Sequence, residues 1–416
     1  MLEIGKYSFG IGDRFAHQGV AQLKAIMKAK EKGIDIVPVW NKSNREHITI
    51  HSSPSDVRYE ADQAVKELNW NGQYFVDADH VNIQNIDSFI DSSDFFTLDV
   101  ADYIGQQAEG QLIEDFVKNC KSMVGNLVIP GVQGTFTISN DLIYDIAKKY
   151  LHAVKQAGII YKNLVSKKGE GNFITEVSMD EVAEAQTPVE LLFILKAIAD
   201  EGIPAQTIAP KFTGRFNKGV DYVGDVKQFA KEFEEDILIV DYAVRNFGLP
   251  ANLKLSVHSG SDKFSIYPFI GDIIRKYDKG IHVKTAGTTW LEELIGLALP
   301  GEYGLQLAKD IYKKAFDRFN ELCIPYENVI DIKQDQLPNP SEVQTWNGQK
   351  FANTLRHIPG NPAFNPSFRQ LLHVGYKVAA EYVNIYTNAL DENKDIIEQQ
   401  VIENIYDRHI KRLFNL

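Results

Sequence analysis

The chain has 416 residues, a formal net charge of -12 and two cysteines in unrelated contexts, Cys120 and Cys323. Its acidic balance disfavours nucleic acid and anionic membranes as partners, and no apolar run approaches the ~20 residues that span a bilayer. The two cysteines form neither a disulfide framework nor a zinc knuckle, and the N-terminus MLEIGKYSFG does not resemble a signal peptide. These features predict a cytoplasmic protein whose partner is a small molecule.

Eight segments share one form in chain order: a short β-rich run, a polar cluster at its C-terminal end, and then a helical pattern. The expected strands lie within residues 7–15, 35–43, 73–81, 95–105, 172–182, 205–214, 252–268 and 280–290. Strands that alternate with helices indicate a parallel sheet, and eight such units favour a closed, TIM-like (β/α)8 barrel. A doubly wound open sheet is the alternative.

The domain organisation follows from the same pass along the chain. We expect residues 1–300 to form the catalytic barrel, with a helical insertion near 106–165 that interrupts the β-α rhythm. Residues 301–416 predict a helical C-terminal extension packed on the barrel. Proline-rich loops interrupt this extension at QLPNPSEVQTWNG and HIPGNPAFNPS.

Polar side chains gather where the expected strands end. In a (β/α)8 barrel these ends open onto one mouth, where the loops supply the chemistry. The residues in question are Asp13, Arg14, Asp77, Asp79, His80, Glu176, Asp180, Glu181, Lys211, Arg215, His258, Asp262, Lys263, His282, Lys284 and Thr285. We therefore expect the functional site at this mouth.

Three histidines on separate strands, His80, His258 and His282, suggest a divalent metal site. Neutral imidazoles bind zinc, cobalt, nickel, manganese or iron, and three protein ligands leave open positions for a substrate. Imidazole accepts several of these ions, so the residues do not identify the metal. The alternative is that each histidine is a hydrogen-bonded core residue.

The carboxylates beside these histidines are candidates for proton transfer. Asp79 and Glu176 are the candidate general acid and base, and Glu176 is alternatively a fourth metal ligand. Side chains alternate along a strand, so Asp77 and Asp79 share a face, while His80 reaches the mouth only if the strand bends at its end. We interpret Asp77 as structural.

Charged residues near the mouth are candidates for binding an anionic substrate. His373, on a helical segment with Leu371 and Leu372, is interpreted instead as a buried structural histidine. The candidate substrate-binding residues are Asp13, Arg14, Lys211, Asp262, Lys263 and Lys284.

Seven motifs occur here in the order typical of one family. They are SFGIGDR, DADHV, EVSMDE, KGVDYVGD, HSGSDKFSIYP, HVKTAG and LLHVGY. In these motifs, from about residue 8 to about residue 376, the chain resembles the tagaturonate epimerase family, bacterial enzymes of hexuronate catabolism that interconvert tagaturonate and fructuronate. Family members carry a further N-terminal region before the first motif, which begins here at Ser8.

The resemblance implies a metal-dependent epimerase of sugar acids. It implies His80, His258 and His282 as metal ligands, Asp79 as proton acceptor and Glu176 as proton donor. A homo-oligomer is compatible with the sequence, which does not fix the oligomeric state. The inverted carbon of the implied reaction lies β to the ketone, where enolate formation does not acidify its C–H bond. Retro-aldol cleavage and re-addition avoids that difficulty. Alternatives are an epimerase of a neutral ketohexose, a metal-dependent hydrolase on the same barrel, and a sugar-binding barrel without catalysis.

Overall fold

The computed structural model describes residues 1–259, 262–285 and 288–416. The motifs HSGSDK and HVKTAG each contain two residues outside these ranges, 260–261 and 286–287 respectively.

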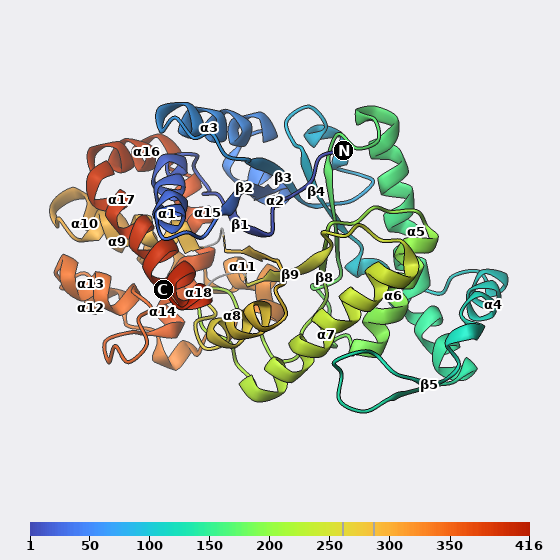
Figure 1. Ribbon diagram of the computed structural model, residues 1–416. Coiled ribbons are helices and arrows are strands. Elements are labelled where there is room, and N and C mark those ends of the chain that lie inside the picture. The colour runs from blue at the N-terminus through green and yellow to red at the C-terminus, as the bar shows by residue number, and fades with distance from the viewer. Residues whose placement is uncertain (260–261, 286–287) are drawn as a thin grey trace.

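A closed parallel barrel forms the centre of the molecule (Figure 1). Its strands follow the order β1-β10-β9-β8-β7-β4-β3-β2, so the first and last strands in the chain pair with each other. This closure confirms the predicted TIM-like barrel and excludes the open doubly wound sheet. The strands are β1 (Tyr7–Ile11), β2 (Ile36–Ser43), β3 (Phe75–Val81), β4 (Phe95–Asp99), β7 (Ile174–Ser178), β8 (Thr207–Ala209), β9 (Lys254–His258) and β10 (Ile281–Lys284).

Helices follow the strands, and local sequence signals mark several of their ends. Thr187 begins α6 with a capping box to Glu190 and a proline in the first turn. Asp225 caps α7, which ends at Gly248 in the left-handed region with φ 75°. The helices up to residue 298 are α1 (Gly19–Glu31), α2 (Asn44–Ile50), α3 (Pro54–Glu67), α4 (Gly110–Asn119), α5 (Asn140–Lys168), α6 (Pro188–Asp200), α7 (Val226–Phe247), α8 (Tyr267–Lys276) and α9 (Thr289–Ala298).

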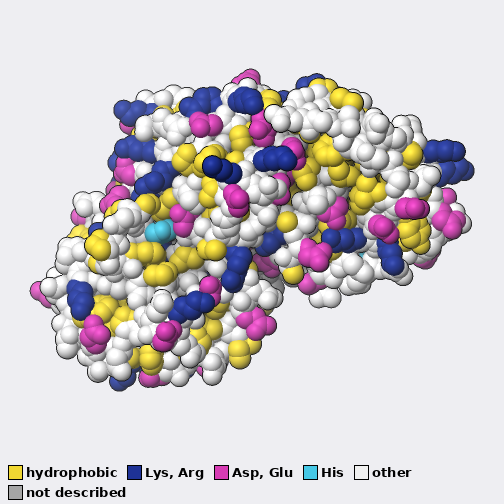
Figure 2. Space-filling model, turned by 90° about the horizontal axis from the view of Figure 1, so that it is seen from below, with side chains coloured by type: hydrophobic (Ala, Val, Ile, Leu, Met, Phe, Trp, Pro, Cys, Tyr) yellow, Lys and Arg dark blue, Asp and Glu magenta, His cyan; other side chains and the backbone are white. Residues whose placement is uncertain are grey.

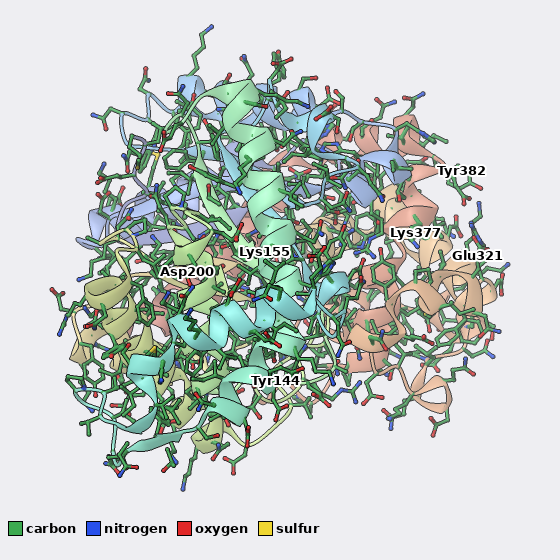
Figure 3. The ribbon with its side chains drawn as sticks, turned by 90° about the vertical axis from the view of Figure 1, so that its right-hand side faces the viewer. Tyr144, Lys155, Asp200, Glu321, Lys377 and Tyr382 are labelled. Carbon is green, nitrogen blue, oxygen red and sulfur yellow. The ribbon has the colours of Figure 1, made fainter. Side chains whose placement is uncertain are left out.

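The predicted helical insertion contains both helices and a small hairpin. Between α4 and α5, the strands β5 (Gly125–Leu127) and β6 (Phe136–Ile138) pair antiparallel. The 29-residue α5 also serves as the crossover helix of the barrel, because β4 pairs in parallel with β7 on its other side. Figure 3 looks onto this side of the molecule, where Tyr144 and Lys155 mark α5.

The remaining chain is helical, as expected, and lies on the opposite side of the barrel from α5 (Figure 1). Helix α17 packs against α9 and α1, and the short α15 packs against α2, which follows β2 directly. The extension therefore reaches the C-terminal ends of the strands. Its helices are α10 (Glu302–Asp317), α11 (Phe319–Cys323), α12 (Pro340–Val343), α13 (Gly348–Leu355), α14 (Pro366–Val374), α15 (Tyr376–Ala380), α16 (Val383–Glu392), α17 (Lys394–Ile402) and α18 (Lys411–Phe414).

The surface is mixed in charge. Figure 2 shows basic and acidic side chains interspersed over one face, with small apolar areas between them. Among the described residues, no helix combines the length and the apolar character needed to cross a membrane.

A buried ionic network joins the extension to the loop after β9. Arg369 on α14 is fully buried and donates to Asp262 Oδ2 at 2.7 Å and to the carbonyls of Gly219 and Leu355 at 2.7 and 2.9 Å. His357 and His409 also contact the Asp262 carboxylate, each at 3.1 Å. Burial of charges costs free energy, and the network offsets that cost only while each charge keeps its partner.

Replacing Arg369 by Met should lower the free energy of unfolding by about 3–5 kcal/mol, because the Asp262 carboxylate would stay buried without its main cation. Guanidinium denaturation measures this change. Arg318→Met is the control, since Arg318 pairs with Glu321 and Glu381 at the surface and its loss should cost under about 1 kcal/mol. Equal losses for both variants would contradict the assignment of the network as a main stabilising contact.

A second buried acid, Glu293 on α9, differs from Asp262 because its partner is a tyrosine hydroxyl and not an arginine. Its carboxyl is fully buried and accepts a hydrogen bond from Tyr386 at 2.9 Å. Burial, together with the nearby Asp13 carboxylate, raises its pKa well above the usual range. The folded protein therefore favours the protonated form of Glu293.

This shift predicts a pH-dependent stability. Above the unfolded-state pKa of about 4.3 the folded state holds a proton that the unfolded state has lost, so the contribution of Glu293 to stability falls as pH rises. Glu293→Gln, which keeps the shape without the ionisation, should gain stability relative to the parent between pH 5 and pH 8. Urea denaturation at both pH values tests this, with the exposed Glu302→Gln as control. A pH-independent difference between parent and Glu293→Gln would rule it out.

Candidate active site

The end of β3 turns two adjacent side chains toward the same mouth. His80 has a positive φ of 54°, and the pairing of β3 with β4 shifts register between Ala78 and Val81. Asp79 and His80 are consequently close, with 2.8 Å between Asp79 Oδ1 and His80 Nδ1. This is the bend at the strand end that the sequence required for His80 to reach the mouth. A left-handed histidine is locally unfavourable, and such strain is typical of functional sites.

Lys284, at the end of β10, occupies the centre of the mouth. Its Nζ lies 2.8 Å from Asp77 Oδ2, 3.0 Å from Asp79 Oδ1 and 3.0 Å from Glu176 Oε1. It also donates to Thr97 Oγ1, and the Thr97 hydroxyl contacts Asp77 and Glu176 in turn. One ammonium group on β10 thus links three carboxylates from two other strands, β3 and β7, and barrel closure brings these strands together.

Gly10, in the SFGIGDR motif, makes room for this lysine. A Cβ at position 10 would lie 2.9 Å from Lys284 Cγ and 2.8 Å from Asn41 Nδ2. The glycine therefore allows close approach of the Lys284 side chain to β1.

His80, Asp180 and His258 form a compact set of potential metal ligands. One ligand atom from each lies within 4.8 Å of the other two, and the described residues contain no second such group. His80 Nε2 lies 3.5 Å and His258 Nδ1 lies 3.2 Å from Asp180 Oδ1. Ser178 orients Asp180 by donating to the same oxygen at 2.6 Å.

The donor set fits a divalent cation. His80 Nδ1 contacts Asp79, and His258 Nε2 lies 2.8 Å from Glu176 Oε1, so each ring is oriented by a carboxylate through one nitrogen. The other nitrogen of each ring is buried, faces Asp180 and makes no well-formed hydrogen bond within the described part of the chain. Histidine ligands held by carboxylates in this way are typical of metal centres.

The closely spaced charges of the site shift the pKa values of its residues. Burial opposes ionisation of Asp79, but Lys284 and His80 outweigh it and hold its pKa below the usual range. Burial likewise opposes charge on His258, but Asp180 and Glu176 raise its pKa to about 9. Asp77 differs, because burial raises its pKa to about 7 despite Lys284. Positive charge therefore accumulates where the carboxylates converge.

His282 lies deeper in the barrel than the other two histidines. Its ring is fully buried, its Nδ1 contacts Ser8 Oγ at 2.8 Å, and burial lowers its pKa to about 3. Its Nε2 has no hydrogen-bond partner among the described residues. It is not in the group of His80, Asp180 and His258, so its role as a ligand stays a prediction.

Two predicted substrate-binding residues follow β1. The Asp13 carboxylate accepts backbone N–H groups of Phe15, His17 and Gln18, and thereby shapes the loop before α1. Arg14 is 5% exposed and pairs with Glu46 Oε1 at 2.8 Å. Arg14 thus lies at the mouth, while Asp13 supports the loop that carries it.

Three further predicted substrate-binding residues lie in different surroundings. Lys211 is half-buried near Asp180, whose charge partly offsets the burial that lowers the lysine pKa. Asp262 lies in the network with Arg369, and Lys263 donates to the carbonyls of Asn217 and Val220 at 2.9 and 2.8 Å. Asp262 and Lys263 therefore contact the loops around the site, and their predicted role in substrate binding stays a prediction.

Two central residues lie outside the set of predicted ligands and catalytic groups. Asp180 appears in the sequence only as a polar residue after the fifth strand, and its short Ser-Met-Asp turn was the available signal. Thr97 sits inside β4 in an otherwise apolar run, and only the barrel shows that its hydroxyl faces Lys284.

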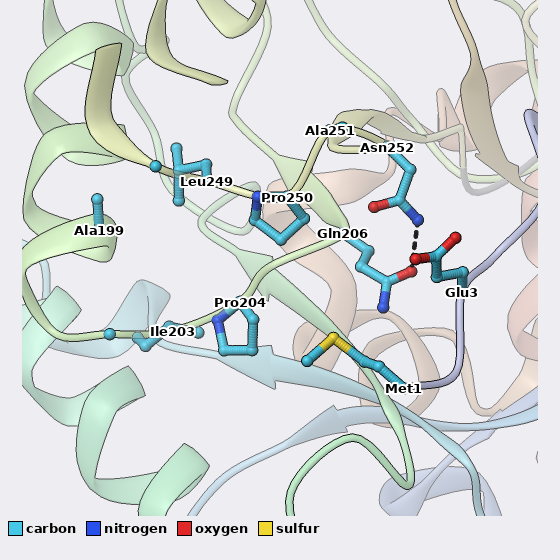
Figure 4. Close-up of a pocket in the computed structure, with 12 residues that line it drawn as sticks. Met1, Glu3, Ala199, Ile203, Pro204, Gln206, Leu249, Pro250, Ala251 and Asn252 are labelled. Atoms are coloured by element: carbon cyan, nitrogen blue, oxygen red, sulfur yellow. Dashed lines mark hydrogen bonds between the residues drawn. The ribbon is translucent and has the colours of Figure 1, made fainter. Parts of the chain in front are cut away.

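A hollow of about 420 Å³ lies at the other end of the barrel (Figure 4). It is lined mainly by residues 202–204, Gln206 and residues 248–252, which precede β8 and β9. Gln206 accepts a hydrogen bond from Asn252 there at 2.7 Å. The candidate site is at the opposite, C-terminal ends of these strands. The hollow is consequently separate from the histidine and carboxylate cluster.

Comparison with known proteins agrees with the fold and shows the family. The model of the tagaturonate epimerase family, UxaE, matches residues 2–413. A tagaturonate/fructuronate epimerase of Thermotoga maritima is 26% identical over 98% of this chain and 80% of its own length. Crystal structures of fructuronate-tagaturonate epimerase from Cohnella laeviribosi, native and with one glycerol, are each 22% identical and share the fold with TM-scores of 0.81 and 0.82, covering 99% of this chain and 82% of theirs. The chain therefore belongs to the tagaturonate epimerase family, and the protein is an isomerase.

Proposed function

We propose that the protein interconverts tagaturonate and fructuronate and that it uses a divalent cation held by His80, Asp180 and His258. The observation that carries this proposal is the convergence of these three ligand atoms within 4.8 Å, beside the carboxylates of Asp79 and Glu176. Family membership supplies the substrate class. A bound cation would supply Lewis acidity for the oxygens of the substrate.

Asp79 and Glu176 lie on either side of Lys284, each 3.0 Å from its Nζ. In the proposed route, Asp79 accepts the proton of the hydroxyl group on the carbon to be inverted. The bond between this carbon and its neighbour α to the ketone then breaks, leaving an aldehyde on one fragment and an enediolate on the other. After the aldehyde turns, the bond re-forms on its other face, and a proton returns to the new alkoxide.

Lys284 supports both proton transfers in this scheme. Its ammonium group contacts Asp79 and Glu176 simultaneously, so it stabilises negative charge on either one and offers a path for a proton between them. Glu176 then returns the proton as the general acid. Because the oxygens are held by a buried network, little reorganisation is needed when charge develops.

The reaction and its cation dependence can be tested together. NMR spectra of the purified protein with tagaturonate should show fructuronate appearing, the conversion should stop after chelation, and an added divalent ion should restore it. Turnover that is unchanged by exhaustive chelation would remove the cation from the scheme.

Cation binding can also be measured directly, without following turnover. Asp180→Asn should weaken binding of Zn²⁺ or Mn²⁺ by at least about tenfold in calorimetry, whereas the exposed Asp278→Asn should not. His282→Asn decides the remaining ligand question: loss of binding would place His282 in the ligand set.

Retro-aldol cleavage makes a separate isotopic prediction. The C–H bond of the inverted carbon stays intact, so fructuronate formed in D₂O should carry hydrogen at that position. NMR of the product measures this directly, with product formed in H₂O as reference. Deuterium at the inverted carbon would require a direct deprotonation instead.

A further inference from the structure

The carboxylate of a sugar acid needs a cationic partner, and two of the predicted substrate-binding lysines, Lys284 and Lys263, are engaged in contacts within the protein. Lys284 Nζ is surrounded by Asp77, Asp79 and Glu176. Lys263 Nζ donates to two backbone carbonyls of the 217–221 loop. Charge-assisted hydrogen bonds to a carboxylate are about twice as strong as neutral ones, so the site for this group should contain other cations.

Arg14 and His373 form a buried pair at the edge of the mouth. Arg14 NH2 lies 3.4 Å from His373 Nε2, and its guanidinium carbon lies 3.8 Å from the centre of the Tyr376 ring. Arg14 is 5% and His373 2% exposed. His373 lies on α14 and Tyr376 on α15, so the C-terminal extension supplies one half of the pair and the loop after β1 supplies the other.

The protons of this pair can be assigned from its chemistry. A guanidinium group only donates, so His373 Nε2 must accept, and the ring proton of the neutral imidazole then sits on Nδ1. His373 Nδ1 and Arg14 Nε are both buried without a hydrogen-bond partner among the described residues. Buried donors without acceptors are costly in a protein interior unless a ligand or water satisfies them.

Charge around the pair is predominantly positive. Burial lowers the pKa of His373, and the cations Arg14, Lys218, Arg369 and Lys263 lower it further. Glu46 partly neutralises Arg14 through the 2.8 Å ion pair. Free donors in a positive environment favour an anionic acceptor.

We propose that Arg14 and His373 bind the carboxylate of the sugar acid and so select uronates over neutral ketoses. This inference rests on the proposed function, since it names the part of the same site that binds the acid group. The pair also lies near the reacting groups, as the proposal requires. Arg14 pairs with Glu46 on α2, and α2 packs against β3, which carries Asp79 and His80. Lys218 adds positive potential from the neighbouring loop.

The test compares equilibrium binding of tagaturonate with that of tagatose, which has a hydroxymethyl group in place of the carboxylate. Arg14→Lys and His373→Phe should each weaken tagaturonate binding by about 10- to 100-fold and raise its KM. Binding of tagatose should change less than about threefold in both variants. Calorimetry or ligand-observed NMR gives the dissociation constants, and steady-state kinetics gives KM and kcat separately.

Matched controls separate recognition from folding. His152→Phe makes the same change on α5, at the opposite side of the molecule in Figure 1, and should leave both constants unchanged. Lys314→Gln is the matched control for a lysine-to-glutamine change and should also leave both constants unchanged. Lys314 lies at the surface of the extension, 3.8 Å from the centre of the Tyr382 ring, which Figure 3 labels. If His373→Phe does not fold, the half-buried Lys218→Gln carries the test and should weaken tagaturonate binding selectively.

Each outcome decides between the two proposals. Equal effects on tagaturonate and tagatose, or no effect on either, would overturn the carboxylate subsite while the epimerase assignment stands. A parent protein that binds tagaturonate without converting it would overturn the proposed function, and the binding constants would still decide the subsite. A parent protein that binds neither sugar would overturn both.

Discussion

Lys284 Nζ lies inside the barrel mouth within 3.0 Å of carboxylate oxygens from Asp77, Asp79 and Glu176. Without this ammonium group, three acids would face one another in a buried space, where like charges strongly oppose ionisation. Burial disfavours charge on Lys284 itself, but these carboxylates raise its pKa well above the usual range. The histidine rings depend on the same interaction, because Asp79 and Glu176 orient them.

Closure of the barrel is what makes this interaction possible. Asp79, Glu176 and Lys284 come from β3, β7 and β10, and the first and last strands pair in register, with Gly10 opposite Lys284. The absence of a side chain at Gly10 lets the lysine lie across β1. A small change in strand register would move each of these side chains away from the mouth, since successive residues face opposite sides of a strand.

The C-terminal extension has a structural and a proposed chemical role. Arg369 donates hydrogen bonds to Asp262 and to the carbonyl of Gly219. These contacts connect the loops after β8 and β9 to the extension. His373 and Tyr376, from the neighbouring turns of the same extension, surround Arg14 at the edge of the mouth. The same segment therefore holds the loops in place and, in our proposal, contributes to substrate recognition.

The sequence by itself determined the eight β-α units, the closed barrel, the helical extension and the polar strand ends, because local periodicity and turn residues encode them. It also indicated His80, His258, Asp79, Glu176 and Lys284 as candidates, since each lies in or near the C-terminal half of a recognisable strand. Only the tertiary structure decided which of these residues meet. It turned His80 inward through a left-handed backbone, brought Asp180 and Thr97 to the centre, and placed Asp262 and Lys263 in supporting contacts. Those outcomes depend on distances between segments far apart in the chain, which neither spacing nor composition contains.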